Sequence, residues 1–195
     1  MKKVGNYLFA LLALALISAK PAAEVKYTLS KGYNVTIDGT SNLHDWTETV
    51  GSVTGNGGIT WNADGTYELS ALIIVMSVHS IKSTEGSMMD KNTYKALKAD
   101  DDPDISFVLA SPVRAVPAGA HVIAARINLT IAGVTKTLDM KVTATSSERG
   151  MVAFEGTQVI NMTDYGINPP VALFGTLKTG NAITIHFKTS FTSSN

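Results

Sequence analysis

Apolar and polar residues alternate along most of the chain from Glu24 onward, a period of two that predicts strands with one buried face. The clearest case is 123–131, where every second residue is Ile, Ala or Leu, and 138–144 repeats the pattern. In 67–76, the longest strand expected, apolar residues fill both faces of the second half, which indicates a strand covered on both sides. The last strand is expected over 183–191.

Glycine, proline and asparagine residues between these strands predict turns. Ala132 and Gly133 predict a tight turn, and Gly55–Gly58 contains an Asn-Gly pair that favours a hairpin. The segment 163–179 holds several Gly and Pro residues and is expected to be irregular. About eight or nine strands with short connections indicate an antiparallel sheet, which must close into a barrel or fold into a sandwich to hide its apolar face. The sustained inward rows favour an all-β barrel. A small closed barrel of about eight strands has an interior that is either filled by side chains or holds one small ligand.

The stretch 87–107 departs from this alternation. Its apolar residues recur at helical spacing, so it predicts one short helix between two strands, placed to act as a lid. Lysines occupy the opposite face of that helix, which is expected to face solvent. The apolar face is expected to hold Met89, Thr93, Ala96 and Leu97, with Tyr94 beside them.

The ends of the helix are predicted from its flanking residues. Ser87 is expected to accept a hydrogen bond from the amide of Asp90, whose carboxylate suits the positive end of the helix dipole. Pro103 disfavours helical geometry in the residue before it, so the helix is expected to stop around Ala99 or Asp100.

The chain of 195 residues is long enough for one domain with a substantial core, which we expect over 24–195. Residues 1–23 have the pattern of a signal peptide: two lysines, an apolar run and then small residues, with cleavage near Ala19 or Ala23. A retained anchor is the alternative, but the unbroken apolar run 7–17 is short for a bilayer span. A periplasmic or secreted location is therefore predicted.

Charge and cysteine content narrow the function. Loss of residues 1–19 removes two of the 16 Lys and Arg residues, leaving 14 against 16 Asp and Glu, a net charge of −2. That balance gives no basis for nucleic-acid binding, which needs a clustered basic surface. The chain has no cysteine, so an exported domain must be held by its core without disulfides.

Four segments together carry a family resemblance. They read GTSNLHDW (39–46), MMDKNTYKALKADDDPDISFVL (88–109), LTIAGVTKTLDMKV (129–142), and MTDYGINPP with GTLKTG (162–170 and 175–180). In their order and spacing they resemble the YceI family of exported proteins, across nearly the whole mature chain. The resemblance implies an extended, eight-stranded, lipocalin-like antiparallel barrel with a short helix, whose lumen takes an amphiphile with a long isoprenoid or fatty tail. Many members carry Arg-Asp where this chain has Met89-Asp90, so a guanidinium that could meet a polar head group is absent there.

The residues expected to bind such a tail are apolar and come from the inward rows and the helix. Flexible methionine thioethers suit a long and variable ligand, although a filled core would use the same residues. The candidates are Trp46, Ile74, Met76, Met89, Tyr94, Leu97, Phe107, Leu129, Ile131, Met140, Phe154 and Met162.

His44 and Asp45 are the most suggestive polar pair. They could contact a ligand head group, but adjacent strand residues point to opposite faces, so a turn or other structural role is favoured. The other histidines are dispersed, and the acidic cluster at 100–104 lacks the central glycine and closing glutamate of an EF-hand, so no metal or cofactor is expected.

Three functions remain open. The first is non-enzymatic binding, transport or sequestration of an isoprenoid or similar lipid, with at most transient membrane contact. The second is an envelope protein-interaction or stress-related module whose barrel is filled. The third, an enzyme, would require His44 to meet His79, His121 or an acid in a pocket, and no catalytic motif in the sequence asks for it. A homodimer is compatible with each of them.

Overall fold

The structure is a computed structural model that describes residues 22–147 and 150–194. The predicted signal peptide, 1–23, lies almost entirely outside the described residues. Strands dominate the described chain, and the single α-helix found there, α1, spans Ser87–Ala96. Three short 3-10 helices are η1 (Val78–Ser80), η2 (Met162–Tyr165) and η3 (Leu173–Gly175). The strands are β1 (Glu24–Leu29), β2 (Asn34–Ser41), β3 (Trp46–Val50), β4 (Val53–Trp61), β5 (Tyr67–Ser77), β6 (Ile81–Ser83), β7 (Asp104–Leu109), β8 (Val113–Val116), β9 (Gly119–Ile131), β10 (Val134–Ser147), β11 (Met151–Asn161), β12 (Val171–Ala172) and β13 (Leu177–Ser193).

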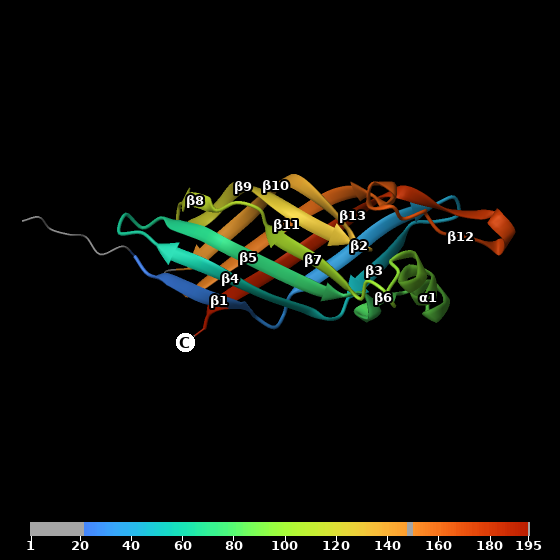
Figure 1. Cartoon of the computed structure of the whole chain (residues 1–195), viewed down its shortest axis with the longest axis horizontal. Coiled ribbons are helices and arrows are strands. Elements are labelled where there is room, and N and C mark those ends of the chain that lie inside the picture. Colours follow the sequence, from blue (N-terminus) through green and yellow to red (C-terminus); the bar gives the residue numbers. More distant parts are fainter. Residues whose placement is uncertain (1–21, 148–149, 195) are drawn as a thin grey trace, which may run out of the picture.

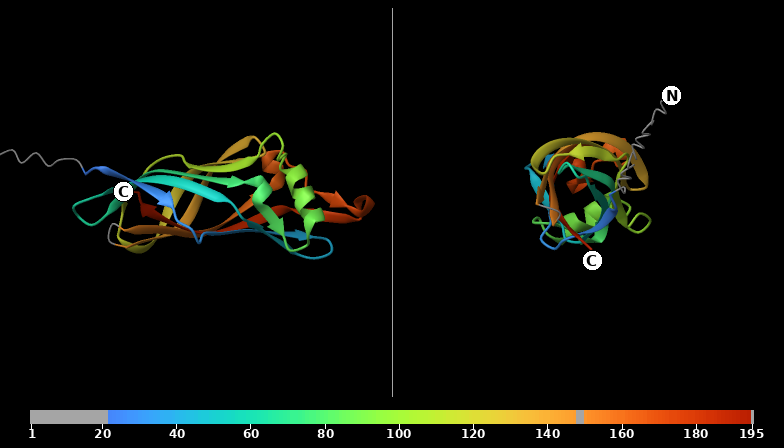
Figure 2. Two further views of the ribbon diagram at one scale, coloured as in Figure 1. Left: turned by 90° about the horizontal axis from the view of Figure 1, so that it is seen from below. Right: turned by 90° about the vertical axis from the view of Figure 1, so that its left-hand side faces the viewer.

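Eight strands form a closed antiparallel barrel, which confirms the predicted fold class. Their order around the ring is β1-β4-β5-β7-β9-β10-β11-β13, and β13 pairs back onto β1, with Tyr27 opposite Ser193. The barrel is elongated, and α1 lies across the end opposite the C-terminus (Figures 1 and 2). Closure leaves no unpaired edge along the ring, so the inward side chains make a single core.

The barrel wall extends beyond this ring of eight strands. Three of the strands, β1, β4 and β5, are each separated by a short break from a second strand segment in the same part of the chain. The segments β2, β3 and β6 pair with one another next to β13, as continuations of β1, β4 and β5 along the chain. The interruptions are joined by side chains: the Tyr33 hydroxyl donates to the Gly51 carbonyl at 2.9 Å, and the Ser52 amide donates to Ser80 Oγ at 2.9 Å. These bonds satisfy backbone groups at the breaks and extend the barrel to the helix.

One turn prediction was wrong, and one irregular segment is shorter than predicted. Gly55–Gly58 is not a hairpin but the middle of β4, where a Cβ on Gly58 would lie 2.6 Å from Ser70 Oγ on the neighbouring strand. The glycines there allow close approach of side chains and not a reversal of the chain. The segment 163–179 is only partly irregular, because β13 begins at Leu177 and, with 17 residues, is longer than β5. The polar residues at its start hide the strand from an alternation argument.

The helix exists, but its ends differ from the prediction. Gly86, with φ of 91°, occupies the N-cap position without a side-chain cap, so the capping box was wrong. The helix ends at Ala96, earlier than expected, because Lys98 adopts φ of 54° and the Ala99 amide turns back to the Tyr94 carbonyl at 2.9 Å. A left-handed residue just past the last turn is a common way to end a helix.

The end of the barrel opposite α1 is closed by aromatic side chains. Tyr27 and Tyr67 are fully buried there, and Trp61 donates from Nε1 to the Tyr27 hydroxyl at 3.0 Å. The rings of Trp61 and Tyr67 pack with their centres 5.1 Å apart. A ligand would therefore have to enter at the helix end or through the wall.

Candidate ligand-binding site

Two apolar cavities lie one behind the other inside the barrel. The first, the helix-end cavity, has about 100 Å³ of free space beneath α1, and the second, the mid-barrel cavity, has about 80 Å³. Both far exceed the roughly 15 Å³ that a water molecule needs, yet their walls offer few partners to water. Cavities of this kind suit apolar groups.

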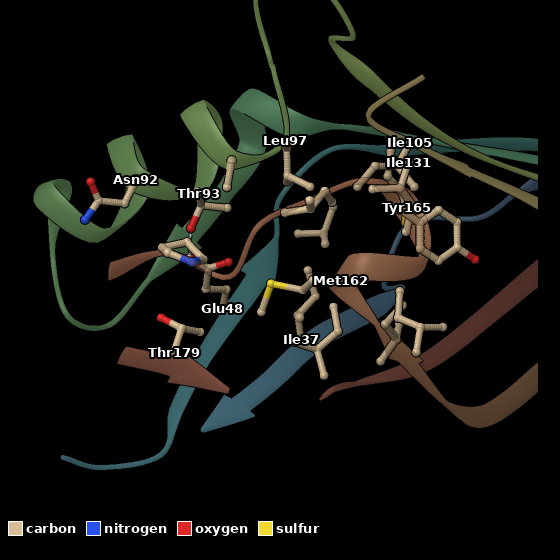
Figure 3. Close-up of a pocket in the computed structure, with 18 of the residues that line it drawn as sticks. Ile37, Glu48, Asn92, Thr93, Leu97, Ile105, Ile131, Met162, Tyr165 and Thr179 are labelled. Atoms are coloured by element: carbon tan, nitrogen blue, oxygen red, sulfur yellow. Dashed lines mark hydrogen bonds between the residues drawn. The ribbon is translucent and has the colours of Figure 1, made fainter. Parts of the chain in front are cut away.

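The helix-end cavity is lined by side chains of several elements. The inward residues of β2 and β3 form its floor, α1 covers it, and η2 and the start of β13 add to the wall (Figure 3). Further parts of the wall come from β5, β7, β9 and β11. Gly39 pairs with Trp46 across β2 and β3, and its missing side chain leaves the space that the Trp46 ring fills. The Trp46 indole then donates from Nε1 to the Thr40 carbonyl at 3.1 Å, which fixes its orientation at the cavity edge.

A narrow waist separates the two cavities. The same four apolar side chains, Val35, Met76, Leu129 and Ile185, line both of them. Only side chains therefore stand between the cavities, and the unbranched Met76 thioether can change rotamer at small cost. A tail longer than one cavity would pass through this waist.

One acid faces the helix-end cavity. Glu48 on β3 is 2% exposed and accepts a hydrogen bond from the Thr93 hydroxyl of α1. Burial raises the pKa of the Glu48 carboxyl, the Thr93 hydrogen bond opposes that shift, and the charge of Asp90 adds to it. None of the described residues lining this cavity is Lys, Arg or His.

A second acid, Asp90, fastens α1 to β6 instead of capping the helix. It accepts from the Ser83 amide at 2.8 Å and from Lys82 Nζ at 3.0 Å. These two hydrogen bonds lower the pKa of the Asp90 carboxyl, and the bond from the Ser83 amide has the larger effect. Lys82 also donates to the Tyr94 hydroxyl at 2.6 Å, so the helix is held at a charged cluster outside the lumen.

The structure places the predicted tail-binding residues as follows. Tyr94 lines neither cavity: the single proton of its hydroxyl is shared between the carbonyl oxygens of His79 and Ile81, at 3.0 and 2.9 Å, so its lumen-facing placement is corrected. The helix-end cavity is lined by Trp46, Met76, Met89, Leu97, Leu129, Ile131 and Met162. The mid-barrel cavity is lined by Ile74, Met76, Phe107, Leu129, Met140 and Phe154.

Sequence reasoning missed the polar lining, above all Glu48. The signal was present, because Trp46, Glu48 and Val50 alternate with exposed threonines and so share the buried face of β3. Also missed were Val35, Ile37, Asn92, Tyr165 and Thr179.

His44 and Asp45 lie in the turn between β2 and β3 and line neither cavity. The Ser41 hydroxyl accepts from the His44 amide at 3.1 Å, and the His44 ring pairs with Glu85 at 3.9 Å on the surface. This geometry favours the turn role over a head-group contact. Within residues 22–147 and 150–194, no three His, Asp or Glu side chains are grouped to hold a metal ion.

Among the described residues, α1 and the short helices are neither long nor apolar enough for a membrane-spanning helix.

The closed barrel, apolar lumen and helix across one end define a lipocalin-like barrel of the kind that can enclose one small ligand. The model of the YceI-like domain matches residues 24–191, and the chain belongs to this family. A comparison with curated proteins finds no match.

Solved structures share the fold at low sequence identity. A polyisoprenoid-binding domain from Saccharophagus degradans, implicated in plant cell wall breakdown, has a TM-score of 0.68 at 13% identity, covering 90% of this chain and 100% of its own. Burkholderia cenocepacia BcnA gives 0.63 at 15% identity, covering 81% of this chain and 95% of its own. A Campylobacter jejuni YceI protein gives 0.58 at 15% identity, covering 76% and 84%.

Proposed function

We propose that this protein binds one amphiphile with a long isoprenoid or fatty tail in the barrel lumen, and carries or sequesters it without chemical change. The observation that carries the proposal is the pair of adjoining apolar cavities inside a barrel that is closed at one end. A long tail gains roughly 0.8 kcal/mol for each methylene removed from water, which favours a bound chain over a free one. The polyisoprenoid-binding domain of similar fold supports the same ligand class.

The tail would have to open the waist to occupy both cavities. Displacement of Met76 joins them at small rotamer cost, whereas the aromatic closure at Tyr27, Trp61 and Tyr67 stops the chain at the far end. The head group then remains at the helix end. The ligand would load and leave beneath α1 and beside the segment 170–179.

The location of the protein belongs to the same proposal. The pattern of residues 1–23 supports export, so the protein would act on lipids in the periplasm or outside the cell. Lipid binding in the lumen of one barrel does not require a homodimer.

Transient membrane contact at the helix end would give access to such lipids. Four exposed apolar side chains lie at or beside that end: Leu43, Met88, Val171 and Phe174. The loops that carry Leu43 and Phe174 are joined, since Asn42 donates from Nδ2 to the Thr176 carbonyl at 2.8 Å. Lys91 and Lys95 are exposed on α1, where they would favour an anionic lipid surface.

A pair of neighbouring alanines on β9 offers a direct test. Ala125 faces the mid-barrel cavity, whereas Ala124 is exposed on the outer face. Ala125→Phe should weaken binding of the C20 alcohol geranylgeraniol by about tenfold or more, because the ring occupies space that the tail needs. Ala124→Phe should leave it unchanged; equal affinity of the two variants would contradict lumenal binding.

A further inference from the structure

Burial of the Glu48 carboxyl in the wall of the helix-end cavity costs free energy. A carboxyl removed from water loses solvation, and its position is favourable only if partners replace the water. Within the described chain, the Glu48 carboxyl has no ion pair, and the one hydrogen bond that it accepts comes from the Thr93 hydroxyl. Lys82 does not compensate it, because that ammonium group pairs with Asp90 at 3.0 Å. A buried acid in a binding cavity with so little compensation points to a functional role.

Three polar side chains of the helix-end cavity, Glu48, Thr93 and Thr179, lie at one side of it, whereas Tyr165, whose buried hydroxyl has no hydrogen-bond partner among the described residues, lies at the other (Figure 3). Figure 3 shows Glu48, Thr93 and Thr179 on one side and Ile105 and Ile131 on the other. The apolar side continues into the mid-barrel cavity through Leu129 at the waist. An amphiphile with its tail in the barrel would therefore bring its head group to Glu48 and Thr93.

The charges around this position discriminate between head groups. A phosphate or carboxylate there would meet the Glu48 carboxyl, with Asp90 nearby on α1 and no basic residue among the described lining residues. Lys91 and Lys95 are exposed and do not line the cavity. An anion would thus be desolvated without a counter-charge, which is strongly unfavourable. A hydroxyl can donate to the carboxyl and accept from Thr93, or the reverse, so it suits either protonation state.

We propose that Glu48 and Thr93 form a head-group subsite that selects a long-chain alcohol over a phosphate or carboxylate with the same tail. This inference rests on the proposed function. It adds which class of amphiphile the barrel takes and which two residues decide it.

Three probes with one C20 tail separate the head group from the tail. They are geranylgeraniol, its methyl ether, which cannot donate a hydrogen bond, and geranylgeranyl monophosphate. The wild-type protein should bind the alcohol about tenfold more tightly than the ether, and the phosphate at least about tenfold more weakly than the alcohol. Phosphate binding equal to or tighter than alcohol binding would overturn the proposal.

Variants then assign the effect to Glu48. Glu48→Leu should bind alcohol and ether equally, and Glu48→Gln should keep a preference for the alcohol while reducing the discrimination against phosphate. Thr49→Leu, the next residue on the exposed face of β3, is the matched control and should behave as wild type. An unchanged alcohol preference in Glu48→Leu would assign the head group elsewhere.

The design separates two failures. If the wild-type protein binds none of the three probes, the proposed lipid-binding function fails. If it binds all three with similar affinity, that function stands and the subsite proposal fails. Should Glu48→Leu not fold, the probe series on wild type and Glu48→Gln still decides the question.

Discussion

The Thr93 hydroxyl of α1 donates a hydrogen bond to the Glu48 carboxyl of β3, 45 residues earlier in the chain. This contact joins the helix over the barrel mouth to an acid that faces the helix-end cavity. A carboxyl has two oxygens, so a ligand hydroxyl placed here could bond to Glu48 and to Thr93 together. The proposed head group would then contact both the barrel wall and the helix.

The raised pKa of Glu48 predicts how stability depends on pH. In the unfolded chain this carboxyl ionises around 4.5, whereas burial in the native state keeps the proton on to higher pH. The unfolded state then binds fewer protons than the native state, so the free energy of unfolding falls as pH rises from about 4.5 through the raised native pKa. Urea denaturation of wild type and Glu48→Gln between about pH 4 and pH 8 should show wild type losing stability relative to the variant. A constant difference over that range would contradict the assignment.

Asp90 should control how firmly the helix is held. Its bonds to the Ser83 amide and to Lys82 connect α1 to β6, so Asp90→Ala should speed amide hydrogen exchange in 83–99 severalfold, while β9 and β10 keep their protection. Asp101→Ala, an exposed acid just past the helix, is the control and should leave exchange unchanged. Equal effects from both substitutions would show that Asp90 is not an anchor. Because its pKa is lowered, the Asp90 contribution is present above about pH 3.8 and is lost as pH falls through the native value.

Phe174 should contribute to membrane contact. It is fully exposed with φ of 55°, a conformation that asparagine adopts readily, so Phe174→Asn removes the ring without straining the turn. We expect binding to vesicles of phosphatidylglycerol and phosphatidylcholine to fall severalfold. Val159→Asn, an exposed apolar residue on the barrel wall, is the matched control and should have little effect. Equal loss in both variants would exclude a specific role for the helix end.

The barrel could be predicted from the sequence because apolar and polar residues alternate in both strands of a hairpin. The pair β9–β10 shows this best, with Ile131 and Val134 flanking a turn at Ala132 and Gly133 where both residues have positive φ. The way in which the interrupted strands are joined could not be predicted, since the hydrogen bonds of the Tyr33 and Ser80 side chains connect segments far apart in the chain.

The site was predictable only in its apolar part. Alternation places Glu48 on the buried face of β3, but not beneath Thr93, because no local pattern shows which helix covers a strand. Tyr94 was misplaced for a geometric reason: successive helix residues are about 100° apart, so one position beyond Thr93 faces β6 and not the lumen.

The central claim is that the lumen holds a long-tailed amphiphile. Mass spectrometry of an organic-solvent extract of the protein, purified from the exported fraction of an overexpressing host, tests it most directly. We predict a stoichiometric lipid with one long isoprenoid or fatty tail and an uncharged hydroxyl-bearing head, depleted in Ala125→Phe but retained in Ala124→Phe. An extract free of such a lipid from the wild-type protein, or the same lipid in equal amount from both variants, would contradict the account.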